Sequence, residues 1–171
     1  TLRIEDYALI GDTHTAALVG ASGSIDWLCL PRFDSPACFA ALLGTSENGF
    51  WEIAPSGEVR RTTRRYRGPT LVLETEFETA DGTARVVDCM SSRTSHARIV
   101  RVVEGVRGAV TMRTRFSPRF DYGRTRPWVR NVDGALAAAA GPEALELRSD
   151  VPLQGHDLEH TAEFTVAPGQ R

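Results

Sequence analysis

The stretch Leu71-Val72-Leu73-Glu74-Thr75-Glu76-Phe77-Glu78 alternates apolar and polar residues, and after Thr79 it is followed by Ala80-Asp81-Gly82-Thr83. Successive side chains of a strand point to opposite faces. We therefore expect a half-buried strand with its apolar side chains in the core and its glutamates in water. Asp-Gly tolerates the positive φ of a tight turn. The stretch predicts a hairpin whose second strand runs from Arg85 to Met90.

Similar strand-and-turn units recur along the chain. Short strands separated by glycine-containing turns at roughly 8–12-residue spacing are typical of an antiparallel sandwich or barrel. The sequence therefore predicts an all-β fold. Further hairpins are expected at 16–30 around Gly20-Ala21-Ser22-Gly23, at 98–116 around Gly105-Val106-Arg107-Gly108 and at 128–148 around Asp133-Gly134 and Gly141-Pro142, with a last strand at 161–166.

Two segments depart from the strand pattern. One short helix is expected near residues 36–43, because Ser35-Pro36 suits a helix start and Gly44 suits a helix end. The arginine- and threonine-rich segment 60–67 is expected to be a solvated loop rather than a binding patch.

The amino-acid composition argues against several classes of protein function. The 171 residues suffice for one domain with a hydrophobic core, and 42% hydrophobic with 25% charged residues is a globular profile. A formal net charge of −2 gives no reason to expect nucleic acid as a partner. No apolar run reaches the roughly 20 residues of a membrane helix. The first 12 residues lack the layout of a secretory signal.

The basic residues and the cysteines narrow the chemistry further. All 20 basic residues are arginines, which excludes a Walker-loop lysine, a Schiff-base lysine and a Ser-x-x-Lys nucleophile pair. Cys29, Cys38 and Cys89 are odd in number and have no CxxC spacing, so we expect reduced thiols in a cytoplasmic protein. We expect no cofactor.

The tetrapeptide Pro-Arg-Phe-Asp occurs twice, at 31–34 and at 118–121. An arginine, an aromatic ring and a carboxylate after a proline look like a site. An arginine beside an aspartate lowers the pKa of the carboxyl, however, which is the wrong direction for a general acid. We therefore expect ion pairs that serve structure or an interface, with Trp27, Phe33 and Phe120 as structural anchors and Arg32, Asp34, Arg119, Asp121 and Tyr122 near one edge of the fold.

Two other motifs have a functional and a plainer interpretation. His156-Asp157-Leu158-Glu159-His160 places two histidines four residues apart, but Pro152 and Gly155 nearby favour a polar turn over a metal site. Gly20 to Ser24 joins two predicted strands, so it lacks the following helix that a phosphate cradle needs. The three tryptophans are expected in the core, with stacking on sugar rings as the alternative.

Several of these segments together resemble the N-terminal part of bacterial glycoside hydrolase family 15 proteins, the glucoamylase-like and trehalase-like enzymes. The resemblance lies in Ile4 to Gly44, Leu71 to Met90, Arg98 to Arg124 and Leu147 to Leu153, and it is most specific in GSIDWLCLPRFDSP and PRFDYGR. It covers nearly the whole chain. The triplet Thr13-His14-Thr15 departs from the family pattern.

The resemblance implies a super-β-sandwich in residues 1–171, followed in such proteins by a catalytic α/α-barrel that this chain does not contain. It implies an inverting hydrolase of α-glucosidic bonds as the parent, with the acid and base glutamates in the barrel, so no catalytic residue is expected here. The expected partners are that barrel, α-linked glucose saccharides through the parent enzyme, and further copies of the domain through an exposed apolar patch.

Two rival hypotheses stay open at this point. The chain alone would serve as an α-glucan- or trehalose-binding module if its tryptophans were exposed. A metal-dependent enzyme would rest on the His156–His160 segment alone. Trehalase and glucoamylase specificity are not distinguished by this sequence.

Overall fold

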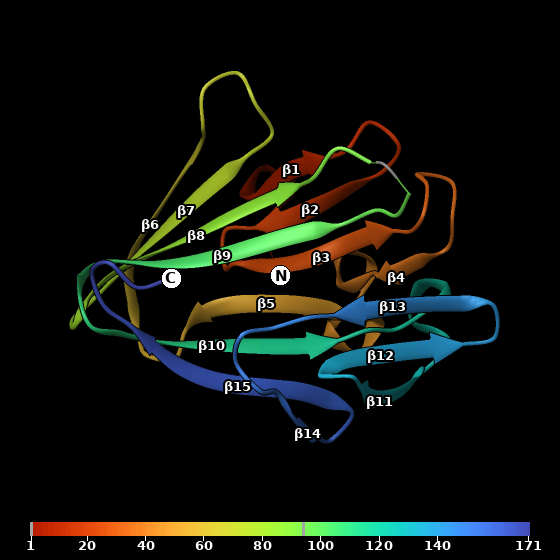
Figure 1. Ribbon diagram of the computed structural model, residues 1–171. Coiled ribbons are helices and arrows are strands. Elements are labelled where there is room, and N and C mark those ends of the chain that lie inside the picture. The colour runs from red at the N-terminus through yellow and green to blue at the C-terminus, as the bar shows by residue number, and fades with distance from the viewer. Residues whose placement is uncertain (1, 94) are drawn as a thin grey trace.

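The computed structural model describes residues 2–93 and 95–171, and its strands form three antiparallel sheets (Figure 1). The first sheet has the order β1-β2-β3-β5-β10-β15-β14, with β4 paired to β3. Its bounds are β1 Tyr7–Gly11, β2 Ala16–Gly20, β3 Ser24–Cys29, β4 Ala37–Phe39, β5 Phe50–Pro55, β10 Val110–Ser117, β14 Gln154–His156 and β15 Glu159–Val166.

Two smaller sheets complete the fold. The second comprises β6 Val59–Tyr66, β7 Leu73–Thr79, β8 Gly82–Met90 and β9 Ile99–Gly108, and the third comprises β11 Trp128–Val132, β12 Ala135–Ala140 and β13 Glu143–Leu147. The helices of the described residues are 3₁₀ turns, η1 Ile4–Asp6, η2 Ala41–Leu43, η3 Ser46–Asn48 and η4 Asp121–Gly123. None of these turns is long and apolar enough to cross a membrane.

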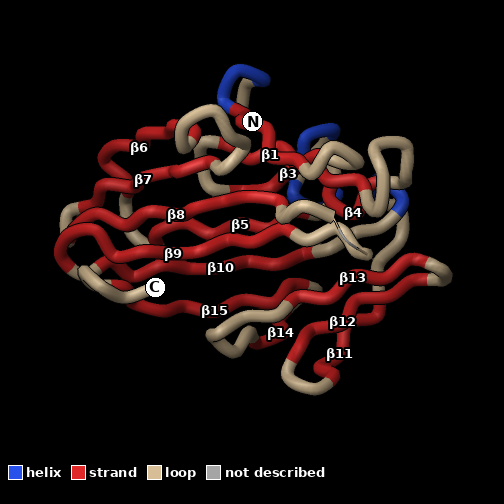
Figure 2. Tube along the Cα trace, turned by 45° about the horizontal axis from the view of Figure 1, so that its top comes forward, coloured by secondary structure: helices blue, strands red, loops and turns tan. Residues whose placement is uncertain are grey.

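The first and second sheets pack face to face, as the sequence predicted for a sandwich. Ile53, Met112 and Val166 of the first sheet meet Phe77, Val86 and Val103 of the second in one buried cluster. A larger cluster joins β1–β3, β7, β8 and β10 to Leu136 and Leu147 of the third sheet. The third sheet therefore covers one end of the core, and Figure 2 shows it beside the sandwich with β11 outermost.

A buried ion pair connects the two faces of the sandwich. The side chain of Arg101 in β9 is buried and donates from Nε to Asp88 Oδ1 of β8 at 2.8 Å. Its Nη1 and Nη2 groups donate across the core to the carbonyls of Trp51 and Gly23, both at 2.7 Å. One guanidinium therefore links the second sheet to β5 and to the β2–β3 turn.

Local hairpins were predicted correctly where Asp-Gly or Gly-rich turns separate alternating strands. β2–β3, β7–β8 and β11–β12 pair as antiparallel neighbours. At the β11–β12 turn Asp133 and Gly134 have φ of 50° and 80°, the positive values for which this dipeptide is favoured.

The hairpin expected around 105–108 is wrong. β9 continues to Gly108 and pairs with β8, whereas β10 pairs with β5 and β15 of the other sheet. Gly108 has a φ of 65°, and a Cβ there would lie 2.1 Å from the carbonyl oxygen of Asp81. Gly108 lies where the chain crosses from the second sheet to the first. The local sequence does not distinguish such a crossing from a hairpin turn.

The helix expected near 36–43 is also wrong. Residues 37–39 form β4, whose three side chains are all buried and which pairs with β3, and only the 3₁₀ turn η2 follows before Gly44. An isolated helix of two turns has little stability of its own. Pairing with β3 and burial of Phe39 therefore decide the conformation.

The segment 60–67 is largely a strand rather than a loop. It forms β6, at the edge of the second sheet, and it pairs with β7. This pairing also corrects the expectation that Glu74 lies in water, because Glu74 is only 5% exposed. It accepts hydrogen bonds from Arg67 and Arg65, which hold the pKa of its carboxyl below the usual range despite burial.

The C-terminal segment returns to the second sheet. Pro168 forms a parallel bridge with Gly105 of β9, and the Gly105 amide donates to the carbonyl of Gln170 at 3.1 Å. A Cβ at Gly105 would lie 2.2 Å from the Ala167 carbonyl oxygen. Glycine is therefore required here for close approach of two backbones, not for a turn.

Candidate functional site

The two Pro-Arg-Phe-Asp segments lie at the same end of the sandwich, where β3 and β10 finish (Figure 1). The first segment leads into β4, and the second leads into η4. The second segment contacts the strand that follows the first, because the amide of Arg119 donates to the carbonyl of Cys38 in β4 at 3.0 Å. The two segments therefore belong to loops at the same end of the fold.

The first segment presents its side chains to solvent. Arg32 Nε donates to Asp34 Oδ1 at 2.9 Å, in a pair whose side chains are both more than two-thirds exposed. This hydrogen bond lowers the pKa of Asp34, as expected from the sequence and opposite to the shift that a general acid needs. Phe33 is 62% exposed. The expectation that its ring is a buried anchor is therefore wrong.

A buried carboxylate holds this loop in place. Asp12 follows β1, and its Oδ1 accepts the amides of His14 and Thr15, each at 2.9 Å. Its Oδ2 accepts Arg93 Nε at 2.8 Å, and Arg93 also donates to the carbonyl of Pro31. Burial would raise the pKa of Asp12, but these hydrogen bonds outweigh it and lower the pKa. Asp12 and Arg93 were not singled out from sequence.

Backbone contacts complete the support of the first segment. The amide of Phe33 donates to the carbonyl of His14 at 3.1 Å, and the hydroxyl of Thr15 donates to the carbonyl of Cys29 at 2.6 Å. The β1–β2 turn therefore holds the loop that leaves β3 at its start and at Phe33. Phe33 is exposed on a braced loop rather than on a loose one.

The second segment has the same residues in a different environment. Phe120 is 4% exposed and lies in the larger core cluster. Arg119 is also buried, and it donates to the carbonyls of Pro118 and Leu158 instead of pairing with Asp121. Asp121 lies 3.8 Å from Arg124. Burial removes Arg119 from the surface candidates, because its guanidinium faces backbone oxygens inside the fold.

Trp27 and Tyr122 contact each other at this end. Their ring centroids are 6.1 Å apart, and Tyr122 has a φ of 58° within η4. The side chain of Asn48 donates to the carbonyl of Tyr122 at 3.1 Å. Trp27 is half-buried and packs against the small buried cluster of Cys29, Ala37 and Ala40. Tyr122 remains partly exposed.

We call the exposed group at this end the loop-end surface. It consists of Arg32, Phe33, Asp34, Leu43 and Tyr122. Leu43 is 65% exposed on η2, which packs on η3, and η3 in turn packs on η4. The loop-end surface combines two large apolar side chains, a phenol and an exposed ion pair.

Asp26 and Asp88, two further carboxylates close to the core, are committed to structural bonds. Asp26 accepts the hydroxyl of Tyr7 at 2.7 Å and that of Ser24, and Asp88 is bound to Arg101. The hydrogen bond to Asp26 and, above all, burial raise the pKa of Tyr7. These groups do not present a carboxyl pair on a shared open cleft, as glycoside hydrolysis needs.

The His156–His160 segment forms the hairpin between β14 and β15, with Asp157 and Leu158 at positive φ in the turn. His156 Nδ1 lies 2.9 Å from Asp157. Within residues 2–93 and 95–171, no group of three His, Cys, Asp or Glu side chains is placed to hold a metal ion. The metal-enzyme hypothesis therefore has no geometric support.

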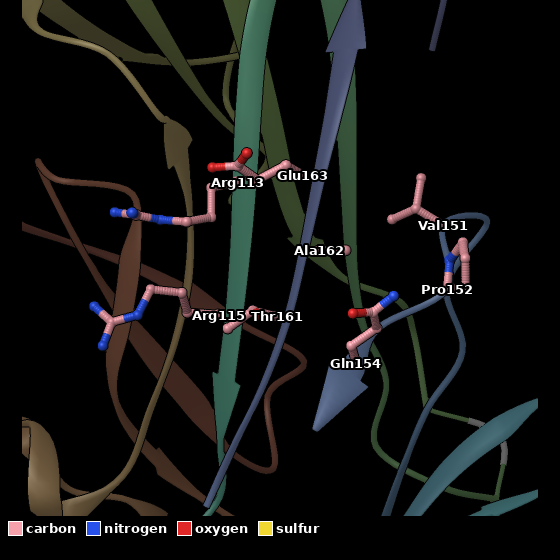
Figure 3. A pocket seen from close by; sticks show the side chains of 8 residues that line it. All are labelled: Arg113, Arg115, Val151, Pro152, Gln154, Thr161, Ala162 and Glu163. Carbon is pink, nitrogen blue, oxygen red and sulfur yellow. The ribbon is translucent and has the colours of Figure 1, made fainter. Parts of the chain in front are cut away.

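A shallow groove of about 570 Å³ runs along β10 and β15 on the outer side of the first sheet (Figure 3). Arg113 and Arg115 extend on one side, and Val151, Pro152 and Gln154 lie on the other. Arg115 donates from Nη2 to both carboxylate oxygens of Glu159, and its guanidinium lies over the ring of Phe50. Arg113 lies 3.7 Å from Glu52. Both arginines of the groove therefore have a carboxylate as a neighbour, which reduces the positive charge that the groove offers to a ligand.

Comparison with known proteins gives this geometry a context. The family model described as "Trehalase-like, N-terminal" matches residues 1–170. The chain belongs to the trehalase-like N-terminal domain family. No solved structure matches the chain.

Trehalases are among the similar proteins. A trehalase of Mycobacterium tuberculosis is 35% identical over 163 residues, which cover 82% of this chain and 24% of that protein. Trehalase 1 of Sulfolobus acidocaldarius is 34% identical over 153 residues, 88% of this chain and 26% of that protein. A trehalase of Thermoplasma volcanium is 30% identical, with coverages of 89% and 25%. The chain thus spans about a quarter of the length of these relatives.

Proposed function

We propose that this chain is the non-catalytic N-terminal domain of a family 15 glycoside hydrolase, of trehalase or glucoamylase type, that acts on α-glucosidic bonds with inversion. The observation that carries the proposal is the match of residues 1–170 to the family, combined with coverage of only a quarter of each trehalase relative. Those relatives contain a further region of about three times this length.

The structure supports a docking role more than a catalytic one. The carboxylates near the loops are paired with arginines or hydrogen-bonded, and Asp34 has a lowered pKa. The loop-end surface instead exposes Phe33, on a loop held by Asp12 and Arg93, and Leu43 on η2. Exposed apolar side chains of this size mark interaction sites when they gather. We propose that this surface packs on the catalytic α/α-barrel and shapes the rim of its cleft.

We also propose a cellular location for the protein and self-association of the isolated domain. The free thiols of Cys29, Cys38 and Cys89 support a reducing, cytoplasmic compartment. An uncovered loop-end surface supports association of isolated copies of the domain.

The isolated 171-residue chain is expected to have no hydrolytic activity on trehalose, maltose or soluble starch. The reason is that Asp34 has a lowered pKa and Asp88 is held in a buried ion pair, whereas a general acid needs a raised pKa and access to the substrate. Glucose release is measured after repurification of the chain. Turnover that persists through repurification and disappears in Asp34→Ala would contradict the proposal.

Phe33→Arg is expected to lower the melting temperature of the full-length hydrolase while changing the unfolding free energy of the isolated chain by less than about 0.5 kcal/mol. The physical reason is that Phe33 is exposed in the isolated chain but covered by the barrel under the proposal. Thermal unfolding of both proteins measures the difference. Ile4→Arg is the matched control, because Ile4 is 72% exposed on η1. Equal effects of the two substitutions in the full-length protein would refute docking through Phe33.

A further inference from the structure

One tryptophan stands outside the core on the third sheet. Trp128 begins β11 and is 87% exposed. Its neighbour Val129 faces the larger core cluster, so alternation along the strand places Trp128 on the opposite, outer face. β11 is an edge strand of the sheet. The indole is therefore presented to solvent from a strand whose other face is anchored.

The surface beside the indole is flat. Trp128 pairs with Ala139 of β12, and Ala139 pairs with Ala144 of β13. Directly opposed Cβ atoms of such pairs are about 4.5–5.5 Å apart. The two alanine side chains of this cross-strand row are too short to cover the indole. The surface beside the ring is therefore open.

The next row on the same face carries hydrogen-bonding groups. Arg130 pairs with Ala137, and Ala137 pairs with Glu146. Both Arg130 and Glu146 are exposed, and Glu146 forms an ion pair with Arg148 at 2.6 Å. A guanidinium offers several donors in a fixed plane, and a carboxylate offers only acceptors. The face thus combines one aromatic platform with donors and acceptors across a floor of alanines.

We propose that this face is a binding site for a pyranose ring of an α-linked glucose saccharide. The C–H face of a pyranose stacks on the electron-rich face of the indole, and its hydroxyls reach Arg130 and Glu146. The flat alanine surface leaves room for a pyranose ring beside the indole. Protein partners, in contrast, are usually anchored by side chains that fill well-packed pockets. The choice of a glucose saccharide rests on the proposed function of the parent enzyme.

The test is a titration of the 171-residue chain with trehalose, maltose and maltotriose. Binding is monitored through the indole N–H signals in a two-dimensional NMR spectrum. The three tryptophans provide internal controls, because Trp51 Nε1 is bonded to Thr114 at 3.2 Å and Trp27 is half-buried against Tyr122. We expect a saturable shift of the Trp128 signal with a dissociation constant in the millimolar range, and no saturable shift of the Trp51 signal.

Two substitutions separate stacking from other effects. Trp128→Ala is expected to weaken binding about tenfold or more, and Trp128→Phe to retain part of it. Ile4→Ala is the control, since it removes an exposed apolar side chain elsewhere and is expected to leave the affinity unchanged. Because Trp128 is exposed, all three variants are expected to fold.

The proposal is overturned if no sugar gives a saturable shift of the Trp128 signal, or if Trp128→Ala binds as well as the parent chain. It is also overturned if the Trp128 signal responds to protein concentration and not to sugar, which would make the indole a contact between copies. None of these outcomes affects docking through Phe33, which is measured by the stability of the full-length protein.

Discussion

Replacing Arg101 by methionine is expected to lower the free energy of unfolding by about 3–5 kcal/mol, the usual cost of removing one partner from a buried ion pair. The substitution leaves Asp88 as a buried carboxylate without its cation. It also removes the guanidinium donor from the carbonyls of Trp51 and Gly23, of which Gly23 still accepts the amide of Ile53. The loss is large because one side chain donates to a carboxylate of the second sheet and to two carbonyls on the other side of the core.

Urea denaturation followed by tryptophan fluorescence measures this loss as a lower midpoint. Arg85→Met is the matched control, because Arg85 pairs with Glu76 and Glu104 at partly exposed positions of the same sheet. Such pairs contribute about 0.2–1 kcal/mol. Equal losses in the two variants would show that Arg101 does not link the sheets in the way its hydrogen bonds indicate.

Asp12→Ala is expected to destabilise the protein by about 3 kcal/mol, because the buried amide of Thr15, the part-buried amide of His14 and a largely buried guanidinium lose their acceptor. The effect is expected to be largest at the loop-end surface, because Arg93 joins Asp12 to the carbonyl of Pro31. Hydrogen exchange of the Phe33 amide, which is bonded to His14, measures the local opening. Asp34→Ala is the control, since its ion pair is exposed.

The same residue predicts a pH dependence. The pKa of Asp12 is lower in the folded protein than in the unfolded chain. Its contribution is therefore fully present above the unfolded value of about 3.9 and is lost as the pH falls through the folded value. We expect Asp12→Asn to flatten the decline of stability below about pH 4. An unchanged acid limb in Asp12→Asn would contradict the assignment.

The sequence predicted local strand pairing well and long-range pairing poorly. The β7–β8 hairpin follows from alternation and Asp81-Gly82, because both signals act between neighbours in the chain. The partner of β10 does not, because β5 and β15 are distant in sequence. Burial of Glu74 depends on Arg65 of β6 and on Arg67 just after it, so no pattern within β7 alone reveals it.

The environment of the candidate site residues was also not predictable from local sequence. Phe33 and Phe120 occupy equivalent positions in identical tetrapeptides, yet one is exposed and the other is in the core. The difference arises because Phe33 sits in a loop held by the β1–β2 turn, whereas Phe120 continues from β10 into the larger cluster. Trp128 was expected in the core, and only the register of β11 on β12 shows its outward position.

The edge strand β6 also bears on how copies of the domain meet. An unpaired strand edge invites addition of a strand from another molecule, and positive charge on the edge opposes it. β6 carries Arg60, Arg61, Arg64 and Arg65. Two such strands repel each other, so sheet-to-sheet polymerisation through this edge is disfavoured. We therefore expect isolated copies to associate through the loop-end surface proposed above and not through this edge.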